Sequence, residues 1–242
     1  MLNHLSVSAV TTYQSCPKMF YLQYVLKVMQ FPSKALEIGK FVHSGIEMFN
    51  QKKDWESILK KEILSKLNDE NVEVFRIVRR IIKTYERNPV EGNTVANELK
   101  CEFPLINSKG EQIPLPFLGF IDRVIDRGIV EYKTSAEDYT QEQIDTSLQA
   151  TIYSYFYGKK YGELPKDIIY WVANKKKVMK EDEYVPQILT TCRTQNDIDN
   201  AFDEVKDVYN NIMAEKFEIG KENHPFWCNC NKYNNLIPNK KI

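Results

Sequence analysis

The chain has 242 residues, of which 43% are hydrophobic and 27% are charged, a composition typical of a globular protein with a full core. Lysine plus arginine and aspartate plus glutamate number 33 each, so the overall charge gives no indication of a nucleic-acid partner. No apolar run approaches the roughly 20 residues of a membrane span, and the N-terminus lacks the layout of a signal peptide. We therefore expect a cytoplasmic protein without a membrane partner.

Residues 1–90 are predicted to be helical. The opening segment contains two serines that could cap a helix and then aromatic residues near helical spacing, with Pro17 dividing it into two pieces. A further helix should follow Gly39 and carry His43. Two amphipathic patterns, both predicted to be helical, occupy residues 54–88.

Residues 95–220 are predicted to form an α/β core. Three strand-like runs, ELKCEFPLI, PFLGFIDRVID and GIVEYKTS, are separated by turn sequences at 107–110 and 126–128. A helix at about 141–161, a strand DIIYWVAN, a second run QILTTC and a long helix at about 194–217 follow, and residues 221–242 read as an irregular tail. This order predicts a mixed α/β fold, which we treat as one domain over residues 1–242.

The strand GIVEYKTS places two charges, Glu131 and Lys133, on one face, because side chains at i and i+2 of a strand point the same way. Hairpin pairing with the preceding strand would bring Asp122 beside Glu131. Neighbouring carboxylates repel each other, and a hard divalent cation such as Mg²⁺ or Mn²⁺ would turn that repulsion into a binding site. The alternative is a set of exposed edge charges in weak ion pairs.

Four elements, taken in order after a family-like N-terminal stretch, resemble the PD-(D/E)XK nucleases, and specifically their RecB-like branch, which includes the Cas4 and AddB nuclease domains. They are His43 on an upstream helix, Asp122 after Gly119, Glu131 with Lys133, and Gln149 followed by Tyr153. The opening YQSCPKMFYLQYV is similar to an N-terminal stretch of the same family. The resemblance covers about residues 5–175 and implies a restriction-endonuclease-like fold, in which a central mixed β-sheet is flanked by helices.

The resemblance also implies a metal-dependent DNA nuclease, most simply an exonuclease acting on ends or single strands. His43, Asp122, Glu131 and the backbone carbonyl of Tyr132 would hold Mg²⁺ or Mn²⁺, and the histidine ligand favours Mn²⁺. Lys133 would position or deprotonate the attacking water and neutralise developing charge, giving a 5′-phosphate product. In the family, the residues matching Gln149 and Tyr153 lie beside the catalytic strand and contact DNA or the catalytic acids.

The implied settings are recombination, repair, phage DNA processing or CRISPR adaptation, with a helicase, recombination protein or CRISPR-adaptation protein as partner. Two alternatives remain open: a catalytically inactive DNA-binding or scaffold module of the same fold, and an unrelated α/β domain with an accidental match.

Two basic segments could neutralise DNA phosphates. They carry Arg76, Arg79, Arg80, Lys83 and Arg87 in one segment, and Lys175, Lys176, Lys177 and Lys180 in the other. A solvated helix face and a solvated loop explain them equally well. Tyrosines at positions 13, 21, 24, 153 and 157 could stack on unpaired bases, although their helical spacing is also typical of core residues.

Five cysteines at irregular spacing argue against a disulfide framework. Nucleases of this branch often hold an iron–sulfur cluster with one upstream and three C-terminal cysteines, and Cys16, Cys228 and Cys230 match three of the four. Because the fourth is missing, we expect plain thiols rather than a cluster. A zinc site formed by His224 with Cys228 and Cys230 is the alternative, and Cys101 and Cys192 are expected to be buried structural residues.

Overall fold

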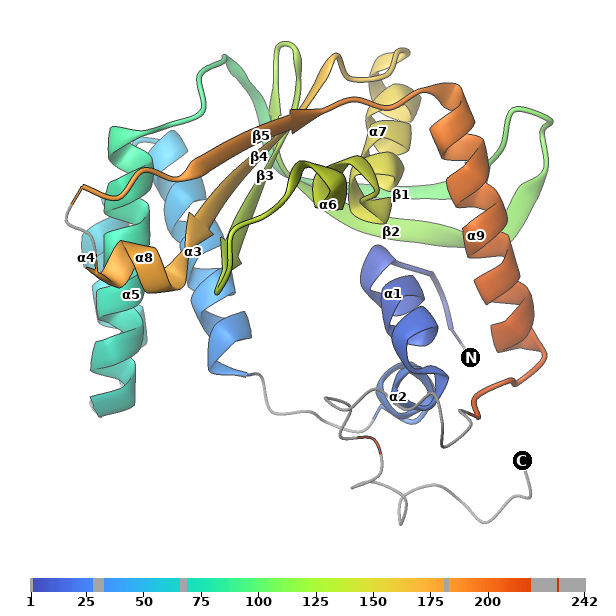
Figure 1. Cartoon of the computed structure of the whole chain (residues 1–242), viewed down its shortest axis with the longest axis horizontal. Helices are drawn as coiled ribbons and strands as arrows, with labels where there is room; N and C mark the ends of the chain where they lie inside the picture. Colours follow the sequence, from blue (N-terminus) through green and yellow to red (C-terminus); the bar gives the residue numbers. More distant parts are fainter. Residues whose placement is uncertain (1, 28–32, 66–68, 181–182, 219–229, 231–242) are drawn as a thin grey trace.

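A five-stranded mixed sheet forms the centre of the protein in the computed structural model, with its strands side by side in chain order (Figure 1). The structure describes residues 2–27, 33–65, 69–180, 183–218 and 230. The strands are β1 (Thr94–Ile106), β2 (Gln112–Ile125), β3 (Gly128–Ser135), β4 (Asp167–Asn174) and β5 (Gln187–Thr191). Neighbouring strands are antiparallel except β3 and β4, which run parallel. The predicted mixed sheet flanked by helices is confirmed.

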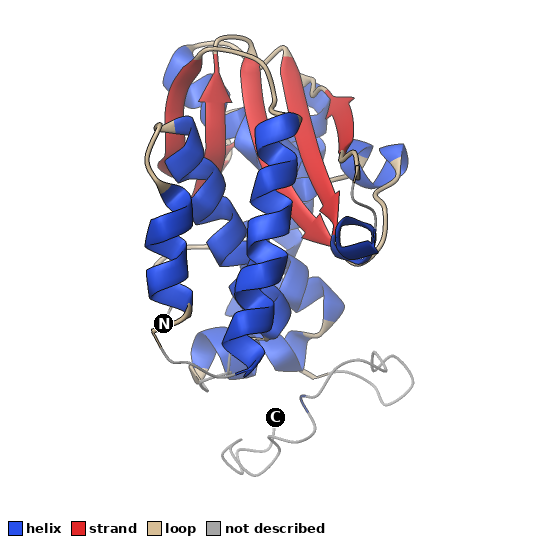
Figure 2. Ribbon diagram, turned by 90° about the vertical axis from the view of Figure 1, so that its left-hand side faces the viewer, coloured by secondary structure: helices blue, strands red, loops and turns tan. Residues whose placement is uncertain are grey.

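Helices cover both faces of this sheet (Figures 1 and 2). One side carries α3 (Lys34–Asn50), α4 (Trp55–Ile63), α5 (Asp69–Arg87) and α8 (Lys175–Lys180), and the other carries α1 (Val7–Ser15), α7 (Leu148–Tyr161) and α9 (Gln195–Met213). Three short elements complete the described helices: α2 (Pro17–Phe20), the π-helical turn η1 (Tyr21–Val25) and α6 (Gln141–Asp145). No helix in the described ranges is both long and apolar enough to cross a membrane.

Strand alternation divides the buried side chains of β3 and β4 between two cores. Val130, Tyr132 and Trp171 pack in the core with α3, α4 and α5, whereas Ile129 and Tyr170 pack in the core with α1, α7 and α9. Glu131 and Lys133 share the strand face of Ile129 and therefore point toward the α7 side. The sequence-based expectation that these two charges share one face is consistent with this arrangement.

Three element boundaries differ from the sequence-based expectation. The helix that carries His43 begins at Lys34 rather than after Gly39, because Ser33 caps it by accepting a hydrogen bond from the backbone N–H of Leu36. The helix expected over 141–161 is two helices, since Ser147 caps a new one. The lysines of NKKKVMK lie in the short helix α8 rather than in a loop.

Candidate active site

The candidate site lies where β2 and β3 separate. In the described structure these strands pair at three positions, ending at Arg123 with Val130. The next residue on each strand carries a carboxylate, Asp122 on β2 and Glu131 on β3. Asp122 Oδ2 accepts a hydrogen bond of 2.8 Å from the Tyr132 N–H. The carboxylate therefore replaces the backbone carbonyl that would accept this bond in a regular strand pair. The expected juxtaposition of the two acids at the hairpin is therefore found.

His43 reaches Asp122 from α3. Its Nδ1 lies 3.1 Å from Asp122 Oδ1, and Asp122 is buried. Burial of the imidazole lowers the pKa of His43, but the charge of Asp122 and the hydrogen bond to it outweigh burial, so the net pKa is raised. The helix–strand contact between a histidine and an aspartate was predicted from the sequence as part of the ligand set.

Glu98 on β1 is a third member of this group, and sequence reasoning missed it. The pairs Asn97 with Arg123 and Leu99 with Ile121 on either side place Glu98 opposite Asp122. One potential ligand atom from each of His43, Glu98 and Asp122 lies within 4.8 Å of the other two. The backbone of Glu98 has a φ of +44°, a conformation that is strained for a residue with a side chain.

The environment of Glu98 disfavours its charge. Burial, and then repulsion from Asp122, raises the pKa of this carboxyl to about 7, although the charge of His43 opposes the shift. A carboxylate held in strained backbone beside a second carboxylate and an imidazole is the arrangement that a bound cation would stabilise.

Glu131 and Lys133 form a second group, on the α7 side of β3. Lys133 Nζ lies 3.3 Å from Glu131 Oε2 and 2.6 Å from Gln149 Oε1, while Gln149 Nε2 donates to Glu131 Oε2 at 2.9 Å. The three side chains therefore form a closed hydrogen-bonded triangle. Gln149 is the second residue of α7, so the Ser147 cap that starts this helix also sets the position of the amide.

One oxygen of this triangle has no partner. Glu131 is fully buried, and its Oε1 atom has no hydrogen-bond partner among the described residues. Burial, and then repulsion from Asp122, raises the pKa of Glu131 well above its usual value. Burial by itself would lower the pKa of Lys133. The charges of Glu131 and Asp122 raise this pKa by more than burial lowers it, so the net pKa lies above its usual value. An unpartnered buried carboxylate oxygen fits a site that receives a cation.

Two tyrosines frame the site from opposite layers. On the α5 side the Tyr132 hydroxyl contacts Asn50 Nδ2 and the Tyr85 hydroxyl, each at 3.2 Å, which fixes the backbone between Glu131 and Lys133. On the other side Tyr153 is buried, and burial raises the pKa of its hydroxyl. Gly119 lies against that ring, since a Cβ atom there would be 2.9 Å from Tyr153 Cε1.

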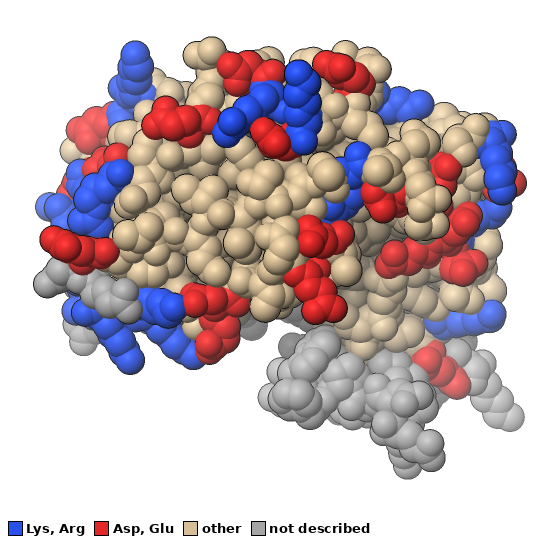
Figure 3. Space-filling model, turned by 45° about the horizontal axis from the view of Figure 1, so that its top comes forward, with Lys and Arg blue, Asp and Glu red and all other residues tan. Residues whose placement is uncertain are grey.

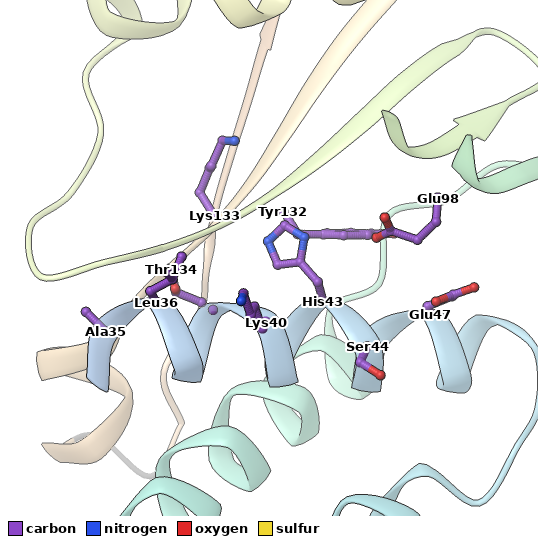
Figure 4. Close-up of a pocket in the computed structure, with 11 residues that line it drawn as sticks. Ala35, Leu36, Lys40, His43, Ser44, Glu47, Glu98, Tyr132, Lys133 and Thr134 are labelled. Carbon is purple, nitrogen blue, oxygen red and sulfur yellow. The ribbon is translucent and has the colours of Figure 1, made fainter. Parts of the chain in front are cut away.

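A cleft of about 630 Å³ opens at this site, and we call it the α3 cleft. Residues 35–47 of α3 form one wall, and Glu98 with residues 132–134 of β3 forms the other. Figure 4 shows the His43 side chain rising from α3 toward Tyr132, and Lys133 pointing away from α3. The cleft gives the side chains of His43 and Glu98 access to solvent, and Asp122 lies buried behind them.

The basic residues predicted to bind DNA are mostly paired with acids. On α5, Arg76 contacts Glu73, Arg79 contacts Glu56, and Lys83 contacts Glu56 and Glu86. On α8, Lys176 contacts Glu137, and Lys177 lies 2.5 Å from Asp138. Figure 3 accordingly shows lysine and arginine atoms interspersed with aspartate and glutamate atoms on the face in view.

The two basic segments adjoin different elements of the fold. Helix α8 directly follows β4, and the pairing of Ser135 with Asn174 places Lys175 next to the end of β3, two residues beyond Lys133. Helix α5, with Arg80 among its basic residues, packs on α3, α4 and α8 and does not continue from a strand of the site. The α8 lysines, unlike the basic residues of α5, therefore continue from the strand pair that carries Lys133.

Cysteines at the two ends of the chain lie together. Cys16 and Cys230 are buried, and their Sγ atoms are 3.7 Å apart. Cys228 and His224, which the cluster and zinc hypotheses also require, lie outside the described residues. Cys101 is buried as expected, but the expectation for Cys192 was wrong, because it is exposed at the first position after β5.

A mixed sheet with aspartate, glutamate and lysine gathered where two strands separate, and with histidine and glutamine added from the flanking helices, is the arrangement expected of a nuclease. The model of the PD-(D/E)XK nuclease superfamily matches residues 4–233, so the chain belongs to that superfamily, whose members are nucleases. A comparison with curated proteins finds no match.

Proposed function

We propose that the chain is a divalent-metal-dependent deoxyribonuclease of the RecB-like branch, acting as an exonuclease on DNA ends or single strands. The observation that carries the proposal is the Lys133–Glu131–Gln149 triangle beside the His43–Asp122 pair. In that arrangement a lysine ammonium lies next to carboxylates that are suited to hard cations, as hydrolysis of a phosphodiester requires.

His43, Asp122, Glu131 and the Tyr132 carbonyl are the proposed ligands, and Glu98 joins them because its carboxylate lies within 4.8 Å of the first two. The unpartnered Oε1 of Glu131 supports the fit of a cation. The bound ion would supply Lewis acidity, polarising a phosphate oxygen and lowering the pKa of a water molecule. The imidazole ligand favours Mn²⁺ over Mg²⁺ at matched concentrations.

Lys133 is proposed to act on the phosphate. Because the charges of Glu131 and Asp122 raise its pKa, the lysine is an ammonium at neutral pH and stabilises negative charge in the transition state. Gln149 holds the ammonium in place through its 2.6 Å hydrogen bond. Tyr153 lies one helical turn after Gln149 on the same face of α7 and is buried, so it helps to fix the helix that carries Gln149.

The wider role is part of the same proposal. A nuclease of this branch would process DNA in recombination, repair, phage replication or CRISPR adaptation, with a helicase or an adaptation protein as partner. The α8 residues Lys175, Lys176 and Lys177 are the stronger candidates for phosphate contacts, because they adjoin the catalytic strand pair. Ion pairing does not separate the two segments, since Lys176 and Lys177 are paired with Glu137 and Asp138 just as the α5 residues are paired with acids.

End-labelled single- and double-stranded DNA, incubated with Mn²⁺, Mg²⁺ or a chelator, tests the activity. Wild-type protein should release nucleotides or short fragments in Mn²⁺, and chelation should abolish the release. Lys133→Ala should lower the rate at least about 100-fold, whereas Lys206→Ala, which removes a partly exposed lysine on α9 that is paired with Glu111, should leave it unchanged. Cleavage that persists in Lys133→Ala contradicts the proposed site, and binding without cleavage by the wild type indicates an inactive module.

A further inference from the structure

Tyr170 on β4 is neither a proposed metal ligand nor a group proposed to contact the phosphate, yet it lies next to the strand that carries Glu131 and Lys133. The parallel register of β3 with β4 places it opposite Glu131. It is 1% exposed and packs in the core on the α7 side of the sheet, the side toward which Lys133 points. A buried tyrosine needs a partner for its hydroxyl, and its ring face attracts a nearby cation.

The ring of Tyr170 faces the ammonium of Lys133. Lys133 Nζ lies over this ring, 5.9 Å from its centroid, within the distance of about 6 Å over which a ring attracts a cation. The attraction is stronger where water is excluded, and the Lys133 side chain is only 22% exposed. Burial, and then the charge of Glu131, raises the pKa of the Tyr170 hydroxyl, so the ring is neutral at neutral pH.

The ring adds a third contact to an ammonium that already has two. Glu131 Oε2 and Gln149 Oε1 are acceptors for two of the three N–H groups of Lys133, which leaves one N–H group for a phosphate oxygen. Two acceptors alone allow the ammonium to swing about the line that joins them. A contact with the Tyr170 ring restricts that motion, and so restricts the direction of the remaining N–H group.

The hydroxyl of Tyr170 reaches the same lysine by a second, indirect route. Tyr170 Oη and Ser147 Oγ are 3.0 Å apart. Ser147 is the N-cap of α7 and accepts a hydrogen bond from the Ala150 N–H, so the hydroxyl contact ties the start of α7 to β4. Gln149, two residues after the cap, is the acceptor of the 2.6 Å hydrogen bond from Lys133.

A buried arginine holds the same helix start independently of Tyr170. Arg193 is 7% exposed, and its guanidinium donates to the backbone carbonyls of Ile144 and Ser147 at 2.7 and 3.3 Å. It also donates to the Thr151 hydroxyl at 2.8 Å. The start of α7 should therefore stay in place when the hydroxyl of Tyr170 is removed, which leaves the ring as the more important of its two contacts.

We propose that Tyr170 is a positioning residue for Lys133, and that its ring, rather than its hydroxyl, holds the ammonium in the orientation in which it meets the scissile phosphate. The inference rests on the proposed function. Every proposed metal ligand remains when Tyr170 is replaced, so Tyr170 should affect turnover and not metal binding.

Two substitutions separate the ring from the hydroxyl, with cleavage of end-labelled single-stranded DNA in Mn²⁺ as the assay. Tyr170→Phe keeps the ring and should keep kcat within about 2-fold of wild type. Tyr170→Leu removes the ring and should lower kcat by between about 3-fold and 30-fold relative to Tyr170→Phe, as expected for the loss of one contact between a cation and a ring. KM for DNA and affinity for Mn²⁺ should stay within about 3-fold in both variants.

A chemical-shift measurement tests the geometry without turnover. In protein labelled with ¹³C-lysine, the methylene protons next to the Lys133 ammonium can be assigned by their absence from Lys133→Ala. The ring current of Tyr170 should displace their shift, and the displacement should be kept in Tyr170→Phe and lost in Tyr170→Leu. Phe202→Leu, which removes a fully buried ring from α9, controls for the loss of a core aromatic and should leave both kcat and this shift unchanged.

Equal kcat in folded Tyr170→Phe and Tyr170→Leu overturns the proposal, and so does a Lys133 shift that is the same in both. If Tyr170→Leu does not fold, Tyr170→Met replaces it, because an unbranched side chain adapts better to the volume of the ring. If wild-type protein shows the displaced shift but cleaves nothing, the contact stands and the proposed activity fails. If it cleaves DNA and the shift is not displaced, the activity stands and the role of Tyr170 fails.

Discussion

The imidazole of His43 and the carboxylate of Asp122, 79 residues apart in the chain, lie 3.1 Å apart between Nδ1 and Oδ1. This contact joins α3 to the point where β2 leaves β3, and it combines nitrogen and oxygen donors in one place. The affinity of the protein for a divalent cation should therefore depend on His43.

Replacing His43 with alanine removes that nitrogen donor and frees Asp122 from its partner. Affinity for Mn²⁺, measured by isothermal titration calorimetry, should fall by about 10- to 100-fold. His4→Ala is the matched control, because it removes a histidine that does not contact this group, and it should bind Mn²⁺ as the wild type does. Equal affinity in wild type and His43→Ala would remove the histidine from the ligand set.

Metal affinity should increase with pH between about pH 6 and pH 8. Burial and the neighbouring Asp122, with a smaller effect of Glu47, raise the pKa of Glu98 to about 7, so its carboxyl is protonated below that pH and ionised above it. His43, whose pKa is also raised, must lose its proton to bind a metal. Both changes act in the same direction, since each proton competes with the cation.

The contribution of Glu98 can be separated from that of His43. At a pH below the pKa of a ligand, the metal must displace the proton of that ligand. Each such proton lowers metal affinity about tenfold for every unit by which the pH falls. The slope of the logarithm of Mn²⁺ affinity against pH equals the number of protons displaced. This slope should therefore be smaller by about one in Glu98→Gln than in wild type. An unchanged slope in that variant would show that Glu98 does not join the ligands.

Gln149 should affect turnover more than metal binding. Its amide bridges Lys133 and Glu131, so Gln149→Leu leaves the ammonium without its 2.6 Å acceptor while all the proposed ligands remain. We expect kcat to fall by about 10- to 100-fold, with Mn²⁺ affinity within about 3-fold of wild type. Gln195→Leu, on the exposed start of α9, is the matched control and should leave both quantities unchanged.

Gly119 should tolerate no side chain, for a reason that is purely steric. A Cβ atom there would lie 2.9 Å from ring atoms of both Tyr153 and Phe156, which are buried in the core under α7. Gly119→Ala should lower the free energy of unfolding by about 1–3 kcal/mol, measured by urea denaturation. It should also lower kcat, because α7 carries Gln149.

Gly39 is the control for that substitution. The nearest atom to a Cβ placed there is Thr134 Oγ1 at 3.7 Å, an ordinary contact distance, and the residue lies inside α3. Gly39→Ala should therefore stabilise the protein by up to about 1 kcal/mol through helix propensity. A comparable destabilisation by both substitutions would mean that the glycine at 119 has no special packing role.

Local patterns were sufficient to predict most of the elements and part of the site. The alternation in GIVEYKTS placed Glu131 and Lys133 on one face, and the tight turn at 126–128 placed Asp122 next to Glu131. Both results depend on short-range geometry. His43 and Gln149 were included through family resemblance, and the structure places both of them in contact with the predicted acids.

Glu98 could not be found in this way. Its position opposite Asp122 depends on the register between β1 and β2, which has irregularities near both ends of the pairing. A shift of one residue would have put Glu98 on the other side of the strand. The end of the β2–β3 pairing was equally hidden, because neither strand has a residue that marks it.

The hydrogen bond from the Tyr132 N–H to Asp122 Oδ2 makes one backbone amide a direct reporter on the site. Most amides in a sheet are protected from hydrogen exchange by carbonyls, which do not change charge. The partner of this amide is a carboxylate, so its chemical shift and its exchange rate should respond when Asp122 binds a cation, releases His43 or is replaced by asparagine. A single resonance could therefore follow the loading of the site in real time, with no substrate present and no turnover required.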